Sequence, residues 1–407
     1  MSLGYKINTK ISDCHRNFAL SGIFLKCSLV LIMEKHNMKI GIDAKWLFTG
    51  HISGKLFIQN ILPELFALHP EMEWHIFLDK RNKDFAFPFK NSNIKIHYIW
   101  AKFNMLSNLF ILPGYAKRLQ LDAVLFQTFF MKKGKFKSVV FIHDILFKNY
   151  PQFFTWKERL YFKPLKWITS SADRIITTTE FVKEELVRFH YAKPHQPIDL
   201  APSGITNIFK PYYQHDGAFL ELVKEKYKLP ASYLLFAGRL NARKNIRGLI
   251  GSLHLLEDKN IPLVIVGEEN WKAPEINELL SQKEIKERIM FTGFVTDDEL
   301  AAIYAMAKAF CFPSFAEGFG LPPLEAMASG IPVIVSETTS MPEVCSHAAL
   351  FVDPGNPKSI AEKINSLLEN KALYEQKKRE GLEWSRQYTW KRTAEGIMQS
   401  VLSAVKM

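Results

Sequence analysis

Cysteine is scarce in this chain, because its 407 residues include only four. These four are too few and too scattered for a disulfide scaffold or a zinc site, and they fit a reducing compartment. The sequence has no run of 18 consecutive apolar residues, which excludes a conventional membrane-spanning helix. Glycine and proline number 20 each, too few for a collagen-like or linker-dominated chain. With 47% hydrophobic and 23% charged residues, the composition excludes wholesale disorder and indicates two or three globular domains.

Acidic residues are fewer than basic residues in the first half of the chain. Residues 1–200 contain 29 Lys and Arg against 16 Asp and Glu, whereas residues 201–407 contain 24 against 25. The whole excess of positive charge therefore lies in the first half. Such asymmetry favours an anionic partner for one domain, either a membrane surface or a nucleic acid. A solvated basic surface without a partner is the alternative.

Residues 1–37 differ from the rest of the chain. They include the apolar run Asn17–Met33, which Lys26 interrupts, and no clear cleavage site follows it. We therefore treat residues 1–37 as an N-terminal extension of uncertain status and expect the functional chain to begin near Met33 or Met38. A membrane anchor is the alternative interpretation.

Short β-branched and aromatic runs alternate with helical patterns from Met38 onward. This alternation predicts an α/β fold with parallel sheets covered on both faces. Proline and glycine in Leu200–Pro211 mark the expected boundary between two Rossmann-like domains that face a central cleft. The expected strands lie within Lys39–Phe48, Trp74–Asp79, Asp122–Gln127, Ser138–Asp144, Arg174–Thr179, Tyr233–Gly238, Leu263–Gly267, Ile289–Gly293, Ala309–Ser314, Pro332–Ser336 and Leu350–Asp353.

The densest group of candidate site residues lies in the segment Phe315–Ser336. Glu317 follows a predicted strand, two glycines come next, and Glu325 lies on the predicted helix beyond them. A glycine-containing turn before a helix offers backbone N–H groups to a phosphate or a sugar hydroxyl, and the carboxylates can accept hydrogen bonds from hydroxyl groups. The segment is not a dinucleotide fingerprint, because the third glycine would fall at Pro323, and it is not a P-loop.

Two cations follow the strand predicted at Tyr233–Gly238. Arg239 comes directly after this strand, and Lys244 lies five residues later, just before a helix. Cations at the carboxyl end of a strand and beside a helix N-terminus suit a diphosphate. A basic loop paired with surface acids is the alternative.

His143 and Asp144 end another predicted strand, in the first domain and on the side of the expected cleft. A lone histidine is more often structural. A neighbouring polar group can, however, orient an imidazole for chemistry, so both residues are candidates for the site.

Taken together and in this order, the motifs resemble those of the retaining GT-B glycosyltransferases of family 4, which include glycogen synthase-like enzymes and lipopolysaccharide mannosyl- and glucosyltransferases. The resemblance runs from Met38 almost to the C-terminus. It rests on the Glu-x7-Glu signature of EGFGLPPLE, the G-R…K-N element, IHD, and PEV followed by LFVDPGNP. It implies a GT-B fold with an acceptor domain at 38–203, a nucleotide-sugar donor domain at 204–386, and a C-terminal helix at 387–407 that returns to the first domain.

The resemblance also implies roles for the residues that match the family motifs. His143 would sit beside the reacting carbon, and Glu317 would lie at the donor sugar. Arg239 and Lys244 would hold the diphosphate and stabilise its charge as the sugar leaves. Glu325 would accept hydrogen bonds from the nucleotide ribose. The implied donor-binding residues are Gly54, Gly238, Arg239, Lys244, Gly318, Phe319, Gly320, Leu321 and Glu325, with Asp144 on the acceptor side.

The chain departs from the family pattern in two places. Gly50 and Gly54 are separated where the family usually has two close glycines, so Gly54 is the weaker candidate for a contact to phosphate. Thr179 stands where a serine is usual, which keeps the hydroxyl. The sequence contains no Asp-x-Asp, so we expect neither a metal nor a cofactor, since fixed cations can stabilise the leaving diphosphate.

Aromatic and basic residues are interleaved in the segments 102–120, 131–137 and 150–168. This pattern suits an anionic membrane interface, although core helices with snorkelling lysines would also produce it. We therefore expect a nucleotide sugar as one substrate and a glycan or lipid-linked saccharide as the acceptor. The expected location is the cytoplasm, with peripheral binding to the membrane.

Within the family, the IGIDA start, IHDILF and MPEV look most like mannosyltransferases that use GDP-mannose in cell-surface polysaccharide or lipopolysaccharide synthesis. A UDP- or ADP-glucose-dependent enzyme of the glycogen or sucrose synthase type is the alternative. Two other classes are an inactive GT-B scaffold and a nucleic-acid-binding protein, which the pI of about 9.3 would suit. The intact charged residues of the motifs argue against the first, and the lack of a nucleic-acid-binding motif argues against the second.

Overall fold

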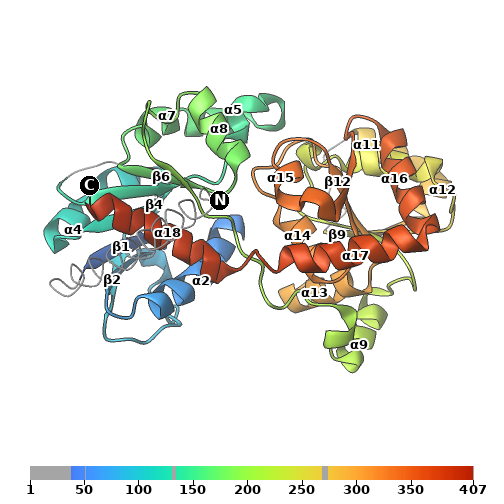
Figure 1. The fold of residues 1–407 in the computed structure, drawn as a ribbon, viewed down its shortest axis with the longest axis horizontal. Helices are drawn as coiled ribbons and strands as arrows, with labels where there is room; N and C mark the ends of the chain where they lie inside the picture. Colours follow the sequence, from blue (N-terminus) through green and yellow to red (C-terminus); the bar gives the residue numbers. More distant parts are fainter. Residues whose placement is uncertain (1–37, 51, 131–133, 268–273, 407) are drawn as a thin grey trace, which may run out of the picture.

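The computed structural model describes residues 38–50, 52–130, 134–267 and 274–406. The expected N-terminal extension at 1–37 lies outside the described residues. The rest of the chain forms two α/β domains side by side, each built on one parallel sheet (Figure 1). The predicted fold class of two Rossmann-like domains is therefore confirmed.

The first domain holds a parallel sheet of seven described strands in the order β3-β2-β1-β4-β5-β6-β7. Its central strands β4 and β5 are mostly apolar and buried apart from the half-buried first residue of β5, because helices cover both faces of the sheet. The strand order reverses between β1 and β4, and ligands of open α/β sheets bind at the carboxyl edge beside such a reversal. The strands are β1 (Lys39–Asp43), β2 (Glu73–Asp79), β3 (Ile94–Ile99), β4 (Ala123–Gln127), β5 (Lys137–Phe141), β6 (Arg174–Thr177) and β7 (Ile198–Leu200).

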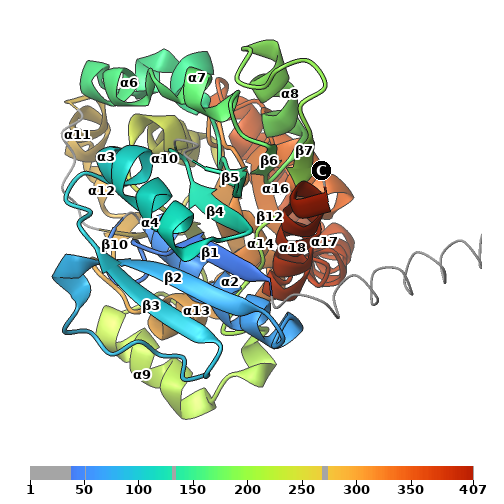
Figure 2. The same ribbon diagram turned by 90° about the vertical axis from the view of Figure 1, so that its left-hand side faces the viewer.

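Helices α2 and α18 pack on one face of this sheet, and α4, α7 and α8 pack on the other. Figure 2 looks onto this domain, with α6 and α7 at its upper edge. The helical segments are α2 (Ile52–Leu68), η1 (Lys80–Asn82), α3 (Asn104–Leu106), η2 (Ser107–Ile111), α4 (Leu112–Leu119), α5 (Leu146–Asn149), η3 (Pro151–Phe153), α6 (Trp156–Phe162), α7 (Leu165–Thr169), α8 (Glu180–Arg188) and α18 (Trp390–Lys406).

The second domain holds a parallel sheet of six described strands in the order β10-β9-β8-β11-β12-β13. Its order reverses between β8 and β11, the two strands that precede the predicted donor-site motifs. The strands are β8 (Leu234–Ala237), β9 (Leu263–Val266), β10 (Ile289–Phe291), β11 (Ala309–Phe312), β12 (Val333–Ser336) and β13 (Ala349–Val352).

Helices cover both faces of the second sheet as well. A capping box begins α13, since the side chains of Thr296 and Glu299 each accept a hydrogen bond from the other residue's backbone N–H group. The helical segments are η4 (Tyr212–Gln214), α9 (Gly217–Tyr227), η5 (Ala242–Lys244), α10 (Ile246–Ser252), η6 (Leu253–Leu255), α11 (Pro274–Ser281), α12 (Lys283–Lys286), α13 (Asp297–Met306), α14 (Leu321–Ala328), α15 (Met341–Cys345), η7 (Ser346–Ala348), α16 (Pro357–Glu369) and α17 (Lys371–Ser385). Within the described residues, no helix combines the length and the hydropathy that crossing a bilayer demands.

The chain crosses between the domains twice, after β7 and between α17 and α18 (Figure 1). The two crossing segments touch, because Ile205 N–H donates to the Tyr388 carbonyl at 3.0 Å. Gly204 allows this approach, since a Cβ there would lie 2.1 Å from the Trp390 nitrogen. Helix α18 then buries Trp390 and further apolar residues in the core of the first domain.

Candidate active site

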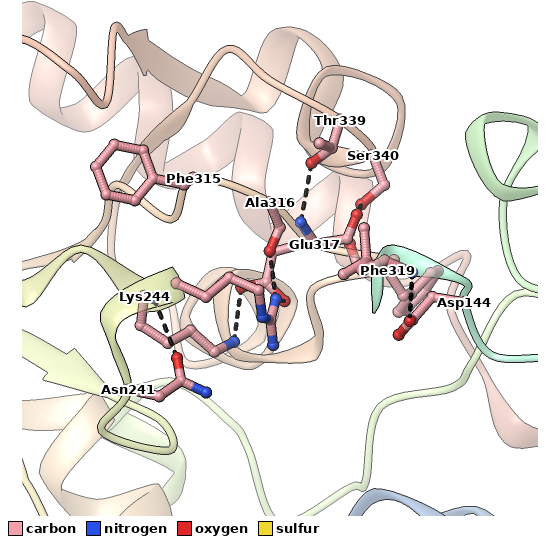
Figure 3. A network of polar contacts seen from close by, with 12 residues as sticks. Asp144, Asn241, Lys244, Phe315, Ala316, Glu317, Phe319, Thr339 and Ser340 are labelled. Atoms are coloured by element: carbon pink, nitrogen blue, oxygen red, sulfur yellow. Dashed lines mark hydrogen bonds and ion pairs between the residues drawn. The ribbon is translucent and has the colours of Figure 1, made fainter. Parts of the chain in front are cut away.

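Glu317 lies between β11 and α14 and is buried, with 6% of its surface exposed. Its Oε1 accepts a hydrogen bond from Lys244 Nζ at 2.7 Å (Figure 3). Its Oε2 lies 3.0 Å from an Arg243 guanidinium nitrogen. Burial by itself would raise the pKa of Glu317, but the two cations outweigh it and hold the pKa below its usual value. The site therefore contains an ionised carboxylate between two buried or half-buried cations.

The position of Lys244 is fixed from several sides. Its backbone N–H donates to the Asn241 side chain at 3.2 Å, and its Nζ lies 4.4 Å from the centre of the Phe312 ring. Burial lowers the pKa of Lys244, although the charge of Glu317 opposes this effect. Arg239, by contrast, is exposed on the loop directly after Gly238. The structure thus joins Lys244 to Glu317 and leaves Arg239 at the surface.

Arg243 is a site residue that the sequence analysis missed. Besides its ion pair with Glu317, its guanidinium donates to the Ala316 carbonyl. Arg243 and Lys244 are neighbours on η5, and both reach the turn after β11, 73 residues further along the chain. Two adjacent basic residues on one short turn are a visible signal, but the sequence alone does not show that both point at the same carboxylate.

Side chains from the loop after β12 hold the backbone of the Glu317 turn. Glu317 N–H donates to Thr339 Oγ1 at 3.0 Å, and Ser340 Oγ donates to the carbonyls of Glu317 and Phe319 at 2.9 and 3.0 Å. Gly320 caps α14 with φ of +104°, a conformation that favours glycine, and a Cβ there would also meet Met341. The predicted donor residues Gly318–Leu321 therefore form a rigid turn at the start of α14.

Glu325 lies on α14, one turn beyond its start, and accepts a hydrogen bond from the Tyr304 hydroxyl at 3.4 Å. Burial raises the pKa of Glu325 to about 7. Its carboxyl group can therefore change protonation near neutral pH. Its ionised form has the acceptor oxygens that binding a ribose hydroxyl requires.

Replacing Glu325 with glutamine is expected to stabilise the protein at high pH. A carboxyl whose pKa is about 7 in the folded state and about 4.3 in the unfolded chain opposes folding as pH rises between these values. The variant should gain about 3.5 kcal/mol over the wild type at pH 8 and less than about 1 kcal/mol at pH 4.5. Chemical unfolding at the two pH values measures this, with the exposed Glu383→Gln as the control. An equal effect of Glu325→Gln at both pH values would contradict it.

His143 and Asp144 follow β5 and meet the Glu317 turn from the first domain. A Cβ at Gly318 would lie 2.5 Å from Asp144 Cβ and 3.1 Å from the His143 carbonyl, so the two domains touch at this glycine. Figure 3 shows Asp144 beside Phe319 of the same turn. Burial lowers the pKa of His143 to about 4, so the imidazole is neutral at neutral pH. Its Nε2 is buried without a hydrogen-bond partner in the described residues. Burial also raises the pKa of Asp144.

Two further contacts join the domains beside Gly318. The hydroxyl of Thr179 donates to the Gly318 carbonyl at 3.0 Å. Thr179 is also the N-cap residue of α8, and its side chain accepts a hydrogen bond from a backbone N–H group of that helix. Glu343 on α15, in the PEV motif, accepts from the N–H groups of Glu180 and Phe181 at 2.8 and 3.0 Å, at the positive end of the α8 dipole. The hydroxyl at position 179, where serine is usual in the family, thus bonds directly to the predicted donor turn.

Gly54 lies apart from these residues, in the first turn of α2. A Cβ at Gly54 would lie 2.2 Å from the Trp46 ring, and one at Gly50 would lie 2.7 Å from it. The structure therefore gives both glycines a packing role against Trp46. Contact between Gly54 and donor phosphate stays a prediction.

Two parallel α/β domains that meet at the carboxyl ends of their strands have the architecture of the GT-B fold. The family model for glycosyl transferases group 1 matches residues 221–384, and that for glycosyltransferase family 4 matches residues 75–206. The chain is 33% identical over 261 residues to an O-antigen chain mannosyltransferase B of Escherichia coli, covering 62% of this chain and 67% of that protein. It belongs to the glycosyl transferases group 1 family, and it is an enzyme that transfers a hexose.

Two other comparisons support the family and the fold, respectively. A serotype-specific mannosyltransferase of Escherichia coli, WbdA, is 30% identical over 55% of this chain, a match that spans only 28% of that longer protein. A sucrose-phosphate synthase from Thermosynechococcus elongatus shares the fold, with a TM-score of 0.67 at 19% identity, covering 89% of this chain and 98% of that one. In the described part of the chain, no three His, Cys, Asp or Glu side chains gather as a metal site.

Proposed function

We propose that the protein transfers mannose from GDP-mannose, with retention of the anomeric configuration, to a glycan or lipid-linked saccharide in cell-surface polysaccharide or lipopolysaccharide synthesis. The names of the mannosyltransferase relatives support the sugar and the pathway. The observation that carries the proposal is the cluster of Glu317, Lys244 and Arg243 at the carboxyl ends of β8 and β11. A donor diphosphate bound at this cluster would lie beside the fixed cations Lys244 and Arg243.

The cations have a direct part in the proposed chemistry. Breaking the bond between the sugar and the diphosphate leaves negative charge on the leaving group, and preorganised cations stabilise that charge. Lys244 and Arg243 would shift part of their interaction from Glu317 to the diphosphate, without a metal ion. His143, which is neutral, would hydrogen-bond the sugar through its unpartnered Nε2. Arg239, exposed at the rim, would contact the outer phosphate or the acceptor.

A thermal-shift panel tests the donor. A ligand at 100 times its Kd stabilises the fold by about 2.7 kcal/mol, a shift of roughly 5 to 10 °C for a domain of this size. We expect this shift with GDP and GDP-mannose, and less than half of it with UDP, ADP, CMP and their sugars. A selective response to UDP-glucose or ADP-glucose would instead support the glucosyltransferase alternative. A response to none of the nucleotides would contradict the donor assignment.

We further propose that the first domain binds the anionic face of a membrane from the cytoplasm. Helices α6 and α7 expose Trp156, Leu160, Tyr161 and Trp167 to solvent, at 64%, 59%, 41% and 68%. We call these four residues the α6–α7 surface. Lys157, Lys163 and Lys166 lie among them and are also exposed. Aromatic side chains surrounded by lysines suit the interface of an anionic bilayer. Residues 131–133 of a second basic segment lie outside the described residues.

The double substitution Trp156→Ala and Trp167→Ala is expected to weaken binding to anionic vesicles at least tenfold, since burying each ring in the interface contributes about 1.5–3 kcal/mol. Co-sedimentation with phosphatidylcholine vesicles that contain 30% phosphatidylglycerol measures this, and added salt should also weaken binding. Phe294→Ala, which removes an 82% exposed aromatic from the second domain, is the control. Equal binding of wild type and double variant would rule out the α6–α7 surface as the membrane contact.

A further inference from the structure

A pocket of about 350 Å³ lies where the chain crosses between the two domains. One wall comes from residues 205–214, which belong to the first crossing and the segment after it. The other wall comes from the end of α17 and residues 386–389, which form the second crossing. We call this the crossing pocket. Its volume is at the lower end of the range of small-molecule sites, enough for one sugar ring with a phosphate. No residue of the Glu317 cluster lines it.

The lining of the crossing pocket contains two cations and no carboxylate. Lys210 belongs to one wall and Arg386 to the other. Among the residues that the structure describes, neither has a carboxylate within ion-pair distance. Two unpaired cations that line one small volume attract an anion, and a phosphate monoester matches them because it has a charge of about −1.5 to −2 at pH 7.

The other lining side chains suit a sugar attached to that phosphate. Tyr213 is 75% exposed, so its ring offers an apolar face to the C–H groups of a sugar. The side chains of Thr206, Asn207 and Gln214 make no hydrogen bond to another described residue. Their hydroxyl and amide groups can each donate to and accept from sugar hydroxyl groups.

Tyr388 joins the crossing pocket to the donor turn. It lines the pocket, and its carbonyl accepts the hydrogen bond from Ile205 N–H that ties the two crossings together. Its ring packs edge-on against Phe319 of the donor turn, with 5.9 Å between the ring centres. Its hydroxyl donates to the Val344 carbonyl of α15 at 3.2 Å. A ligand that contacts both walls therefore restrains the crossings in the arrangement in which the domains meet at Gly318.

We propose that the crossing pocket is a regulatory site that binds a phosphorylated monosaccharide and thereby strengthens donor binding. The phosphate lies between Lys210 and Arg386, and the sugar ring lies against Tyr213. The ligand contacts both walls only when the crossings are in the arrangement described here, so it favours that arrangement.

The coupling to the donor rests on the proposed function, which places the sugar nucleotide between Glu317 of the second domain and His143 of the first. A donor bound in this way also favours the arrangement in which the domains meet. Because coupling between two sites is reciprocal, each ligand strengthens the binding of the other by the same factor. Binding of the sugar phosphate itself does not depend on the identity of the donor.

Isothermal titration of the full chain in the absence of donor tests the site, with mannose 6-phosphate, mannose and inorganic phosphate as the probes. Mannose 6-phosphate should bind at least about tenfold more tightly than either of the others, since it alone combines the charge-assisted contacts with those to the sugar ring. Equally tight binding of inorganic phosphate would overturn the assignment of a sugar. Equally tight binding of mannose would overturn the role of the two cations.

Lys210→Gln and Arg386→Gln should each weaken the binding of mannose 6-phosphate about three- to tenfold. Lys371→Gln is the matched control, because Lys371 is an exposed lysine at the other end of α17, and it should have no effect. Binding that is lost in Lys244→Ala but retained in Lys210→Gln would assign the probe to the donor site and overturn the inference.

The coupling is measured by titrating GDP-mannose with and without saturating mannose 6-phosphate. We expect GDP-mannose to bind about fivefold more tightly when the sugar phosphate is present, and Arg386→Gln to reduce this difference. Unchanged affinity for GDP-mannose, while mannose 6-phosphate binds, would overturn the regulatory role. A chain that binds mannose 6-phosphate but no GDP-mannose would support the crossing pocket and contradict the proposed donor alone.

Discussion

Lys244→Ala is expected to lower kcat by about 10²- to 10³-fold, the range seen when one preorganised group that stabilises transition-state charge is removed. Lys244 is buried, and its Nζ lies 2.7 Å from Glu317. KM for the nucleotide sugar should change less than kcat, because the charge on the leaving diphosphate is greatest in the transition state. Steady-state release of the nucleotide measures both parameters, and unchanged turnover would contradict the diphosphate assignment.

The control for this experiment must separate lost chemistry from lost folding. Removing one partner of a buried ion pair destabilises a protein by about 3–5 kcal/mol, whereas replacing both partners by apolar residues is often neutral. In Lys244→Ala, Glu317 keeps its ion pair with Arg243 at 3.0 Å, so the loss of stability should fall below that range, and the melting temperature is measured alongside kcat to confirm that the variant is folded. Lys363→Ala, which removes an exposed lysine from the same domain, should leave both activity and stability unchanged.

Gly318→Ala is expected to reduce kcat/KM at least a hundredfold, because small misplacements of reacting groups have effects of this size. A Cβ at position 318 would lie 2.5 Å from Asp144 Cβ, closer than such atoms approach, and 3.1 Å from the His143 carbonyl. The two domains would have to separate at the place where the donor turn meets the first domain. Binding of the free nucleotide to the second domain should be retained, since the added methyl group faces the first domain.

Gly217→Ala is the matched control for Gly318→Ala. Gly217 lies in the same domain, at the start of α9, and a Cβ there meets nothing within 4 Å. This change should leave activity intact and stabilise the protein slightly, because alanine loses less conformational entropy on folding. If Gly318→Ala were as active as Gly217→Ala, the contact between Gly318 and Asp144 would have no part in the reaction.

Most of the fold could be predicted because its central strands are short apolar runs bounded by glycine, proline or polar residues. The two strands that were missed lie at the edges of the first sheet. β3 has two exposed positions and β7 has only three half-buried residues, so neither shows a continuous apolar run. Pairing with β2 and β6 makes them strands, and pairing between distant segments is not visible in local sequence.

Candidate site residues could be predicted where they lie within one sequence motif. They were harder to predict where the site forms from segments that are distant in the sequence. Glu317 and Lys244 were identified from their strand-end positions. Arg243 was missed because its partner lies on another loop. The bond from Thr179 to Gly318, and the packing of Gly54 against Trp46, depend on how segments meet in space. Composition and spacing contain no signal for such contacts.

The most direct test of the central claim is nucleotide release from GDP-mannose, UDP-glucose and ADP-glucose by the full chain, with excess EDTA and an added lipid-linked oligosaccharide. Our account predicts that GDP-mannose turns over at least tenfold faster than the other donors, that EDTA has no effect, and that the new linkage has the anomeric configuration of the donor. Turnover that requires a divalent metal, or a product of inverted configuration, would contradict the assignment of Lys244 and Arg243 as the groups that stabilise the leaving diphosphate in a retaining transfer.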